Sequence, residues 1–337
     1  MKSRLISLAM MAMVGCTSAQ YASPAVGAVP APGNAVVASR RQNVTFMPQG
    51  TRWLIALNFS GTGTLAAKQN SFFAVTVENR PWFRHMQQEI QRTLGVNATK
   101  QIRSLWAFGA AQGRRSGSFI LDTTVPAKTI TDQLRKSSAT SLDSYDGVNI
   151  FRVKNTFGPP HHRHVGKLFL AVVDPGIVVG SMSEKLLEQS LDAHLGIKKC
   201  LSLKSHLFDG QTPRQIFYFS FVHLQQAIDA AQNPLSVPPQ VRAIRAVHLM
   251  AVSGPKAVEM HGDLQMLSAK AANRSAAQLK LLKKMAYHAN TGANATDRQM
   301  VLAGIIERLK LSTQNDRVII EWRMPYALLR HLAPPHH

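Results

Sequence analysis

The sequence KLFLAVVDPGIVVGSMSEKLLEQSLDAHLG, residues 167–196, is the stretch that decides the fold. Two short apolar runs, residues 168–173 and 177–179, are rich in β-branched side chains, as expected of strands buried on both faces. The sequence DPG lies between them at 174–176 and favours a tight turn, because proline presets φ and glycine tolerates a positive φ. The stretch therefore predicts a hairpin.

A helix is expected directly after this hairpin. Ser181 and Glu184 have the spacing of a capping box, in which each side chain accepts a hydrogen bond from the other residue's backbone N–H. Such a cap typically contributes about 1 kcal/mol of stability. Gly196 is expected to end the helix. The residues predicted to face the sheet share one stripe at helical spacing: Leu186, Leu187, Ser190, Leu191, His194 and Leu195.

The same plan of two strands and then a helix recurs twice elsewhere in the chain. It is found at about residues 103–136, where RSLWAFGA and SFILDTT are the two strands, and again at about residues 244–288. The predicted fold class is therefore α+β, with antiparallel sheets built from repeated hairpin-then-helix units and helices packed on one face.

The length of 337 residues is enough for two ordinary domains. Residues 198–212, KKCLSLKSHLFDGQT, are polar, basic and irregular, which places the expected boundary there. The expected organisation is a signal peptide (1–19), a flexible tether (20–44), a first α+β domain (45–197), a linker (198–212) and a second α+β domain (213–333). The tether is inferred from its Ala, Pro, Gly and Ser content and its lack of an amphipathic period.

The first residues have the three-part layout of a secretory signal peptide. Lys2 and Arg4 precede the apolar run 5–14, which is too short to span a bilayer, because a spanning helix needs roughly 20 apolar residues. Cys16 ends the sequence AMVGC, which resembles the lipobox of bacterial lipoproteins and makes this cysteine the candidate for lipid attachment. Ordinary cleavage after Ala19 is the alternative. We therefore expect an exported protein, either periplasmic or anchored to a membrane by a lipid.

The composition is that of a strongly basic globular protein. Hydrophobic residues make up 45% of the chain, charged residues make up 17%, and the formal net charge at pH 7 is +21. Such a charge favours association with polyanions. The expected partners are an anionic polymer of the cell envelope, lipid headgroups or a protein. The alternative is that the charge adapts the protein to its compartment, since net charge bears on solubility and association and not on fold.

A basic helix face is expected over residues 268–288. The residues predicted to face the core are Ala272, Ala276, Leu279, Leu282 and Ala286, and the candidates for binding a polyanion on the outer side are Lys270, Arg274, Lys280, Lys283 and Lys284. Residues three and four apart share a helix face, so these cations form one patch. For this helix taken alone, a solvated face without a partner is the favoured interpretation, because no aromatic residues interleave with the cations to stack bases. Nucleic acid is not expected as the partner.

Three histidines supply the candidate metal ligands. His161, His162 and His164 lie in the loop GPPHHRH, and neutral imidazole is a common metal ligand. Their spacing fits no standard zinc site, and Arg163 would repel a cation. A solvated basic loop is therefore favoured, and no metal is expected.

Cys200 is the one cysteine besides Cys16. It is a candidate nucleophile with His194 or His206 as its base, but no family signature surrounds it. Free cysteine is often buried in proteins. A small buried hydrophobe is therefore the favoured interpretation of this residue.

The motifs of the common enzyme classes are missing from the sequence. No glycine-rich phosphate loop, Gly-x-Ser-x-Gly elbow, His-Glu-x-x-His helix or Cys-x-x-Cys pair occurs, so no cofactor is expected. We expect a non-enzymatic envelope protein that binds a polyanionic or protein partner through a basic surface. The alternatives are a hydrolase-like enzyme of the periplasm, or a nucleic-acid-binding protein if the N-terminus is not cleaved.

Taken whole, the chain resembles a loose class of exported bacterial α+β proteins, lipoproteins among them. The resemblance rests on the strand LWAFGA, the hairpin LAVVDPGIVVGS and the helical run SAKAANRSAAQLKLL, and it covers residues 50–330 of the chain. No activity is established for that class. The resemblance therefore implies the fold and the location only.

Overall fold

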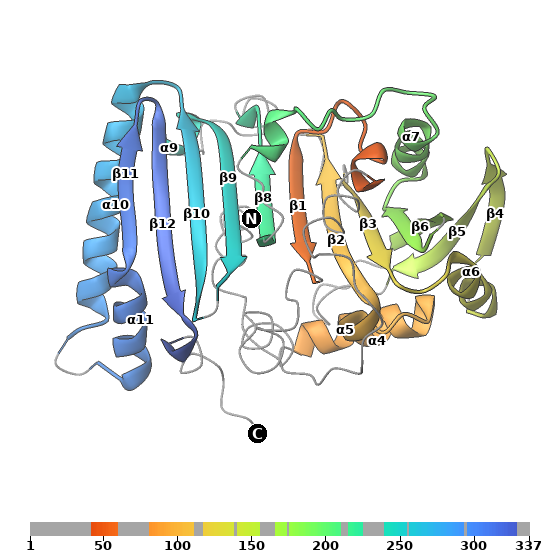
Figure 1. Ribbon diagram of the computed structural model, residues 1–337, viewed down its shortest axis with the longest axis horizontal. Coiled ribbons are helices and arrows are strands. Elements are labelled where there is room, and N and C mark those ends of the chain that lie inside the picture. Colours follow the sequence, from red (N-terminus) through yellow and green to blue (C-terminus); the bar gives the residue numbers. More distant parts are fainter. Residues whose placement is uncertain are drawn as a thin grey trace. The chain divides into compact units, whose positions relative to one another are not determined.

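The computed structural model describes residues 42–59, 81–110, 117–137, 140–155, 166–173, 175–209, 215–224, 239–254, 256–292 and 295–328. These residues form two compact units (Figure 1). The larger unit holds the described residues from 42 to 59 and from 85 to 250, and the smaller one holds residues 81–84 and those from 251 onward. The division falls between Met250 and Ala251, and not at residues 198–212 where a linker was expected.

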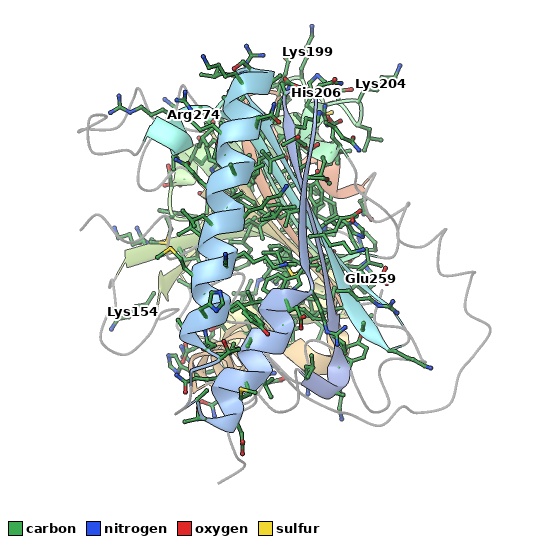
Figure 2. The ribbon with its side chains drawn as sticks, turned by 90° about the vertical axis from the view of Figure 1, so that its left-hand side faces the viewer. Lys154, Lys199, Lys204, His206, Glu259 and Arg274 are labelled. Carbon is green, nitrogen blue, oxygen red and sulfur yellow. The ribbon has the colours of Figure 1, made fainter. Side chains whose placement is uncertain are left out.

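The smaller unit is an antiparallel sheet covered by helices (Figures 1 and 2). Strand β12 (Arg317–Pro325) lies between β10 (Ala257–Met266) and β11 (Leu309–Gln314). Helix α10 (Ala269–Ala289) packs along these strands, and α11 (Asp297–Glu307) packs against α10. The expected arrangement of a helix on one face of an antiparallel sheet is therefore confirmed for this unit.

Strand β9 (Ile244–Ser253) begins in the larger unit, and its last residues belong to the smaller one. The backbone N–H of Gly254 donates to the carbonyl of Ala257 at 2.9 Å and closes the turn into β10. The order β9, β10, α10 is the third of the expected hairpin-then-helix units.

The sheet of the larger unit has the strand order β9-β8-β1-β2-β3-β7-β6-β5-β4, and its pairs from β8 to β4 are antiparallel. Its strands are β1 (Trp53–Asn58), β2 (Ile102–Gly109), β3 (Gly117–Thr123), β4 (Thr140–Tyr145), β5 (Val148–Asn155), β6 (Gly166–Val173), β7 (Ile177–Ser181) and β8 (Gln215–Phe221). Strand β8 pairs with β1, with Trp53 opposite Phe221. This pairing explains the absence of a boundary at 198–212, because the chain on both sides of that segment belongs to one sheet.

Helices lie on both faces of this larger sheet, which differs from the expected packing on one face. The described helices that begin before β9 are α4 (Pro81–Leu94), α5 (Ala98–Gln101), α6 (Ala127–Lys136), α7 (Glu184–His194) and α9 (Pro239–Arg242), with a 3₁₀ turn η3 (His206–Phe208). Leu187 of α7 shares a core cluster with Val179, whereas Leu134 of α6 shares the other cluster with Val178. Neighbouring residues of a strand point to opposite faces. Because β7 is buried on both sides, as its apolar sequence predicts, both faces need a cover.

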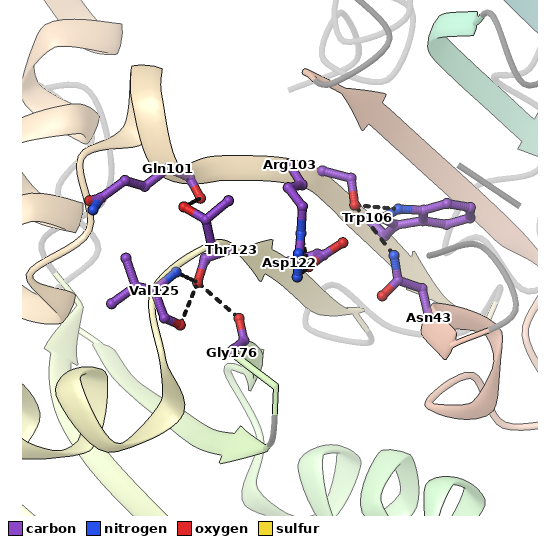
Figure 3. A network of polar contacts seen from close by, with 10 residues as sticks. Asn43, Gln101, Arg103, Trp106, Asp122, Thr123, Val125 and Gly176 are labelled. Atoms are coloured by element: carbon purple, nitrogen blue, oxygen red, sulfur yellow. Dashed lines mark hydrogen bonds and ion pairs between the residues drawn. The ribbon is translucent and has the colours of Figure 1, made fainter. Parts of the chain in front are cut away.

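The turn between β6 and β7 confirms the positive φ expected of its glycine (Figure 3). Gly176 has a φ of +111°, and its N–H donates to the carbonyl of Val173 at 3.1 Å. Its own carbonyl accepts from the Thr123 hydroxyl at 2.9 Å, at the end of β3. A Cβ at this position would lie 2.3 Å from the carbonyl oxygen of Val125. Only glycine fits this contact, which docks the turn onto the neighbouring hairpin.

Helix α7 forms where it was expected, but without the predicted capping box. Ser183 is the N-cap residue, and no side chain caps this end of the helix. Ser181 ends β7 instead, and its hydroxyl donates to the carbonyl of Gly117 at 3.1 Å and accepts from the N–H of Ser183 at 3.2 Å. The strand thus extends further than the sequence pattern indicated and removes Ser181 from the helix.

The other end of α7 follows the prediction more closely. Gly196 has a φ of +77° and lies directly after the C-cap residue Leu195. Leu187 and Leu191 are fully buried, as expected, whereas Leu195 is 42% exposed. The buried stripe therefore ends one turn earlier than predicted.

The segment before β1 belongs to the core. Residues 42–45 are helical, and Asn43 and Val44 are buried, so the tether expected at 20–44 does not extend to its last residues. The amide of Asn43 donates to the hydroxyl of Ser104 at 3.3 Å, and the indole N–H of Trp106 donates to the same hydroxyl at 3.0 Å (Figure 3). The rest of the predicted tether and the predicted signal peptide lie outside the described residues.

Candidate anion-binding surface

Helix α10 carries all five of the basic residues expected to bind a polyanion. The Ser268 hydroxyl caps its N-terminus by accepting from the N–H of Ala271 at 3.2 Å. The residues that it buries are small, namely Ala272, Ser275 and Ala276. Small side chains allow a close approach to the sheet, and the long cationic side chains are left for the opposite side.

Four of the five predicted cations are exposed along α10, and we call Lys270, Arg274, Lys280 and Lys284 the basic face. Figure 2 shows Arg274 projecting away from the helix. No Asp or Glu occurs between Asp263 and Asp297. Within the described ranges, no ion pair involves a side chain of this face. Its positive charge is therefore uncompensated within the structure.

Lys283 does not belong to the basic face, which corrects the prediction for this residue. Its ammonium donates to the carbonyls of Glu307 and Leu309, at 2.8 and 2.6 Å. Glu307 is the last residue of α11, where backbone oxygens lack partners within the helix and a cation is favourable, and Leu309 is the first residue of β11. Lys283 therefore ties α10 to the end of α11 within the smaller unit.

Leu282 is 58% exposed, although it was predicted to face the core. Leu281 and Met285 are each 59% exposed, so three large apolar side chains lie in solvent within one turn of α10. Lys283, and not Leu282, lies on the same side of the helix as the buried Ala276, because residues 276 and 283 are two turns apart. We call Leu281, Leu282 and Met285 the apolar patch, which was not expected from the sequence.

The open face of the sheet in the smaller unit differs from α10 in its charge balance. Arg317 donates to Asp263 at 2.5 Å, and Arg323 lies 3.7 Å from Glu259. These arginines and carboxylates face one another across β10 and β12. Here the cations are matched by acids, which leaves α10 as the stronger candidate for an anionic ligand.

Cys200 is exposed, contrary to the predicted burial. The backbone around it pairs with the N-terminal segment, since Leu201 N–H donates to the Met47 carbonyl at 2.6 Å and Cys200 bridges Pro48. Side chains alternate along extended backbone, so the burial of Leu201 directs Cys200 outward. It lines a hollow of about 590 Å³ together with Lys199 and other polar residues.

Neither histidine proposed as a base for Cys200 is hydrogen-bonded to it in the structure. His194 Nδ1 lies 2.9 Å from the Thr45 hydroxyl, and its ring stacks on Phe46 with 3.9 Å between centroids. Burial lowers the pKa of His194. His206 Nδ1 lies 3.0 Å from Asp209. The described contacts therefore assemble no cysteine–histidine pair.

Two further polar clusters lie in the larger unit and were not expected from sequence. In the first, the Tyr145 hydroxyl donates to Asp192 at 2.5 Å, and the Lys198 ammonium donates to the other carboxylate oxygen. The bond from Lys198, followed by that from Tyr145, holds the pKa of Asp192 below its usual value. The bond to Asp192 raises the pKa of Tyr145 to about 12. The cluster ties the β4–β5 hairpin to α7.

The second cluster pairs a serine with a histidine inside the core. Ser220 Oγ lies 3.0 Å from His248 Nδ1, and the Tyr218 hydroxyl donates to the Leu207 and Asp209 carbonyls at 2.9 and 2.8 Å. Ser220 is fully buried and His248 is 8% exposed. This buried contact joins β8 to β9.

The remaining predicted sites lie outside the described residues. These are the lipid-attachment candidate Cys16 and the histidines His161, His162 and His164. Across the part of the chain that the structure describes, no group of three or more His, Cys, Asp or Glu residues is arranged to hold a metal ion. No helix of that part is long and apolar enough to cross a membrane.

Comparisons with known proteins give no family for this chain. No family model matches it, and no curated protein matches it. Crystal forms III and IV of TP0453 have TM-scores of 0.46 and 0.45 with 10% sequence identity, and the alignments cover 86% and 87% of this chain and 96% of the other. Because these TM-scores lie below 0.5, the likeness carries no argument about the family or the function.

Proposed function

We propose that the protein is an exported, non-enzymatic protein of the cell envelope that binds a polyanionic partner through the basic face of α10. The observation that carries the proposal is that Lys270, Arg274, Lys280 and Lys284 are exposed on one helix with no acidic neighbour along it. Like charges on one surface create a positive potential that attracts polyanions. The net charge of +21 adds a long-range contribution of the same sign.

Export belongs to the same proposal and is supported by the sequence of the first residues. Its test is the intact mass of the protein purified from its native host. Loss of residues 1–15 with a lipid on Cys16, or cleavage after Ala19, would support export. A mature product that still carries Met1 would contradict it.

The binding proposal is tested by retention of the purified full chain on heparin against increasing salt. Charge-driven binding weakens steeply with ionic strength. We expect a variant with glutamine in place of Lys270, Arg274, Lys280 and Lys284 to elute at clearly lower salt than the unchanged protein. Its dependence of affinity on salt should also be shallower, because fewer counterions are released.

A control variant separates the basic face from the net charge. Lys100, Lys136, Lys154 and Lys185 are exposed in the larger unit, and replacing them by glutamine removes the same charge. This variant should elute close to the unchanged protein. Equal losses in the two variants would show that only the net charge matters, and the proposal for α10 would fail.

A further inference from the structure

The apolar patch of α10 exposes hydrophobic side chains, and a polymer of charged groups has no apolar surface to cover them. Leu281, Leu282 and Met285 are between 58 and 59% exposed, whereas the opposite side of the helix is committed to the sheet. Exposed apolar side chains of this size are common singly, but contiguous ones on a soluble surface usually mark an interaction site. The patch therefore needs a partner that offers an apolar phase.

Charge and apolarity lie side by side on this helix. Lys280 and Lys284 are four residues apart, and so are Leu281 and Met285, so the two pairs form adjacent ridges. Two turns before Leu281, the same ridge carries Arg274. The outward surface of α10 is thus basic in its first half and both basic and apolar in its second.

We infer that this surface of α10 lies on an anionic lipid bilayer, with the apolar patch inserted at the level of the headgroups. The inference rests on the proposed function and names its partner. A bilayer interface supplies negative headgroups for the lysines and acyl chains for the leucines, and a helix with this pattern binds parallel to the membrane plane. The cations keep α10 from crossing, which agrees with the finding that it is not apolar enough to span.

Lysine side chains favour this geometry for a second reason. Their aliphatic stems can run along an apolar surface while the ammonium groups stay among the headgroups. Lys280 and Lys284, which flank the apolar patch, can therefore reach lipid phosphates while Leu281 and Leu282 are inserted. Each cation near such a surface strengthens binding by roughly fivefold.

The inference is tested by co-sedimentation with vesicles of equimolar phosphatidylcholine and phosphatidylglycerol, with pure phosphatidylcholine vesicles as reference. The test variant carries Leu281→Gln, Leu282→Gln and Met285→Gln. It should bind the mixed vesicles at least about tenfold more weakly than the unchanged protein. Its retention on heparin should be unchanged, because the basic face is intact.

A control variant carries Leu195→Gln and Ile197→Gln, which removes two exposed apolar side chains from the larger unit. It should bind the mixed vesicles as the unchanged protein does. An equal loss in this control would overturn the assignment to α10. Thermal unfolding of each variant checks that it is folded.

Vesicle binding of the unchanged protein at high salt is a further test that needs no variant. We expect some binding to the mixed vesicles to remain at high salt, because the apolar patch contributes to it.

The outcomes separate the two proposals. Vesicle binding that depends on the basic face but not on the apolar patch would overturn this inference and leave the proposed function intact. Retention on heparin without binding to the mixed vesicles would do the same and point to a polymer or a protein as the partner. Equal binding to pure phosphatidylcholine would overturn the role of charge. No dependence of either heparin or vesicle binding on the basic face would overturn both proposals.

Discussion

The ammonium of Lys283 donates to the backbone carbonyl of Leu309 at 2.6 Å, and the next residue along the chain, Lys284, is exposed. Two adjacent lysines on one helix therefore have different tasks. The first joins α10 to the end of α11 and the start of β11, and the second contributes to the basic face.

Replacing each lysine by methionine should separate these tasks. Lys283→Met should lower the free energy of unfolding by about 1–2 kcal/mol, because two carbonyls lose a charged donor. Lys284→Met should change stability by less than about 0.5 kcal/mol, as is usual for an exposed site. Urea unfolding measures the first effect, and elution from heparin, which only Lys284→Met should shift, measures the second. A larger loss of stability in Lys284→Met would contradict the assignment.

Gly176→Ala should be among the more damaging single substitutions in the larger unit. The added Cβ would lie 2.3 Å from the Val125 carbonyl oxygen, at a φ of +111°. Strain and the forced shift together should cost about 2–4 kcal/mol in the free energy of unfolding. Gly147→Ala is the control, since its φ is also positive at +80° but no atom lies within 4 Å of its Cβ. It should cost about 1 kcal/mol. Equal effects in the two variants would show that the contact with Val125 is unimportant.

His194 should make stability depend on pH in the weakly acidic range. The Thr45 hydroxyl donates to the Gln42 carbonyl at 2.7 Å and so accepts from Nδ1 of the ring. Burial lowers the pKa of His194 in the folded protein, so the unfolded chain takes up a proton first as the pH falls. The stabilisation is therefore complete above pH ~6.5 and is lost as the pH falls from there through the folded pKa. Urea unfolding measured from pH ~6.5 downward should show that the free energy of unfolding falls less steeply with pH in His194→Gln than in the unchanged protein. An equally steep fall in the two proteins would contradict the prediction.

Asp192 should contribute a second, more acidic dependence. Its bonds to Lys198 and Tyr145 lower its pKa in the folded state, so the stabilisation is present above the usual carboxyl value and is lost as the pH falls through the folded pKa. Asp192→Asn should lower the free energy of unfolding by about 1–3 kcal/mol at neutral pH. The difference from the unchanged protein should shrink in strong acid. Tyr145→Phe leaves the bond between Asp192 and Lys198 in place, so it should lower the free energy of unfolding by less than Asp192→Asn does.

The parts of the fold that follow from local rules could be predicted from the sequence. The turn between β6 and β7 follows from its glycine and from the two apolar runs beside it, and Gly176 has the positive φ expected there. Strands β4 and β11 were not predicted, because Thr140–Tyr145 and Leu309–Gln314 are largely polar and become strands by pairing with β5 and β12. Pairing of this kind depends on distant residues, which a local pattern does not include.

The sequence indicated the basic helix, but it did not indicate correctly which side chains of that helix face the core. Hydrophobicity alone assigned Leu282 to the core and Lys283 to the surface. The signal that could have corrected this is the spacing of Ala272, Ala276 and Leu279, which continues to Lys283 at the helical period. The exposure of Cys200 was missed for a related reason, because its direction is set by the backbone pairing with Pro48.

The N-terminal segment has a mechanical consequence. Phe46 and Met47 have no exposed surface, and Asn43 is bonded to Ser104 on β2. A pull applied to the chain at residue 43 would therefore act directly on the middle of the sheet. Such a load would be resisted by packed side chains from residue 43 onward, and not by the end of an edge strand.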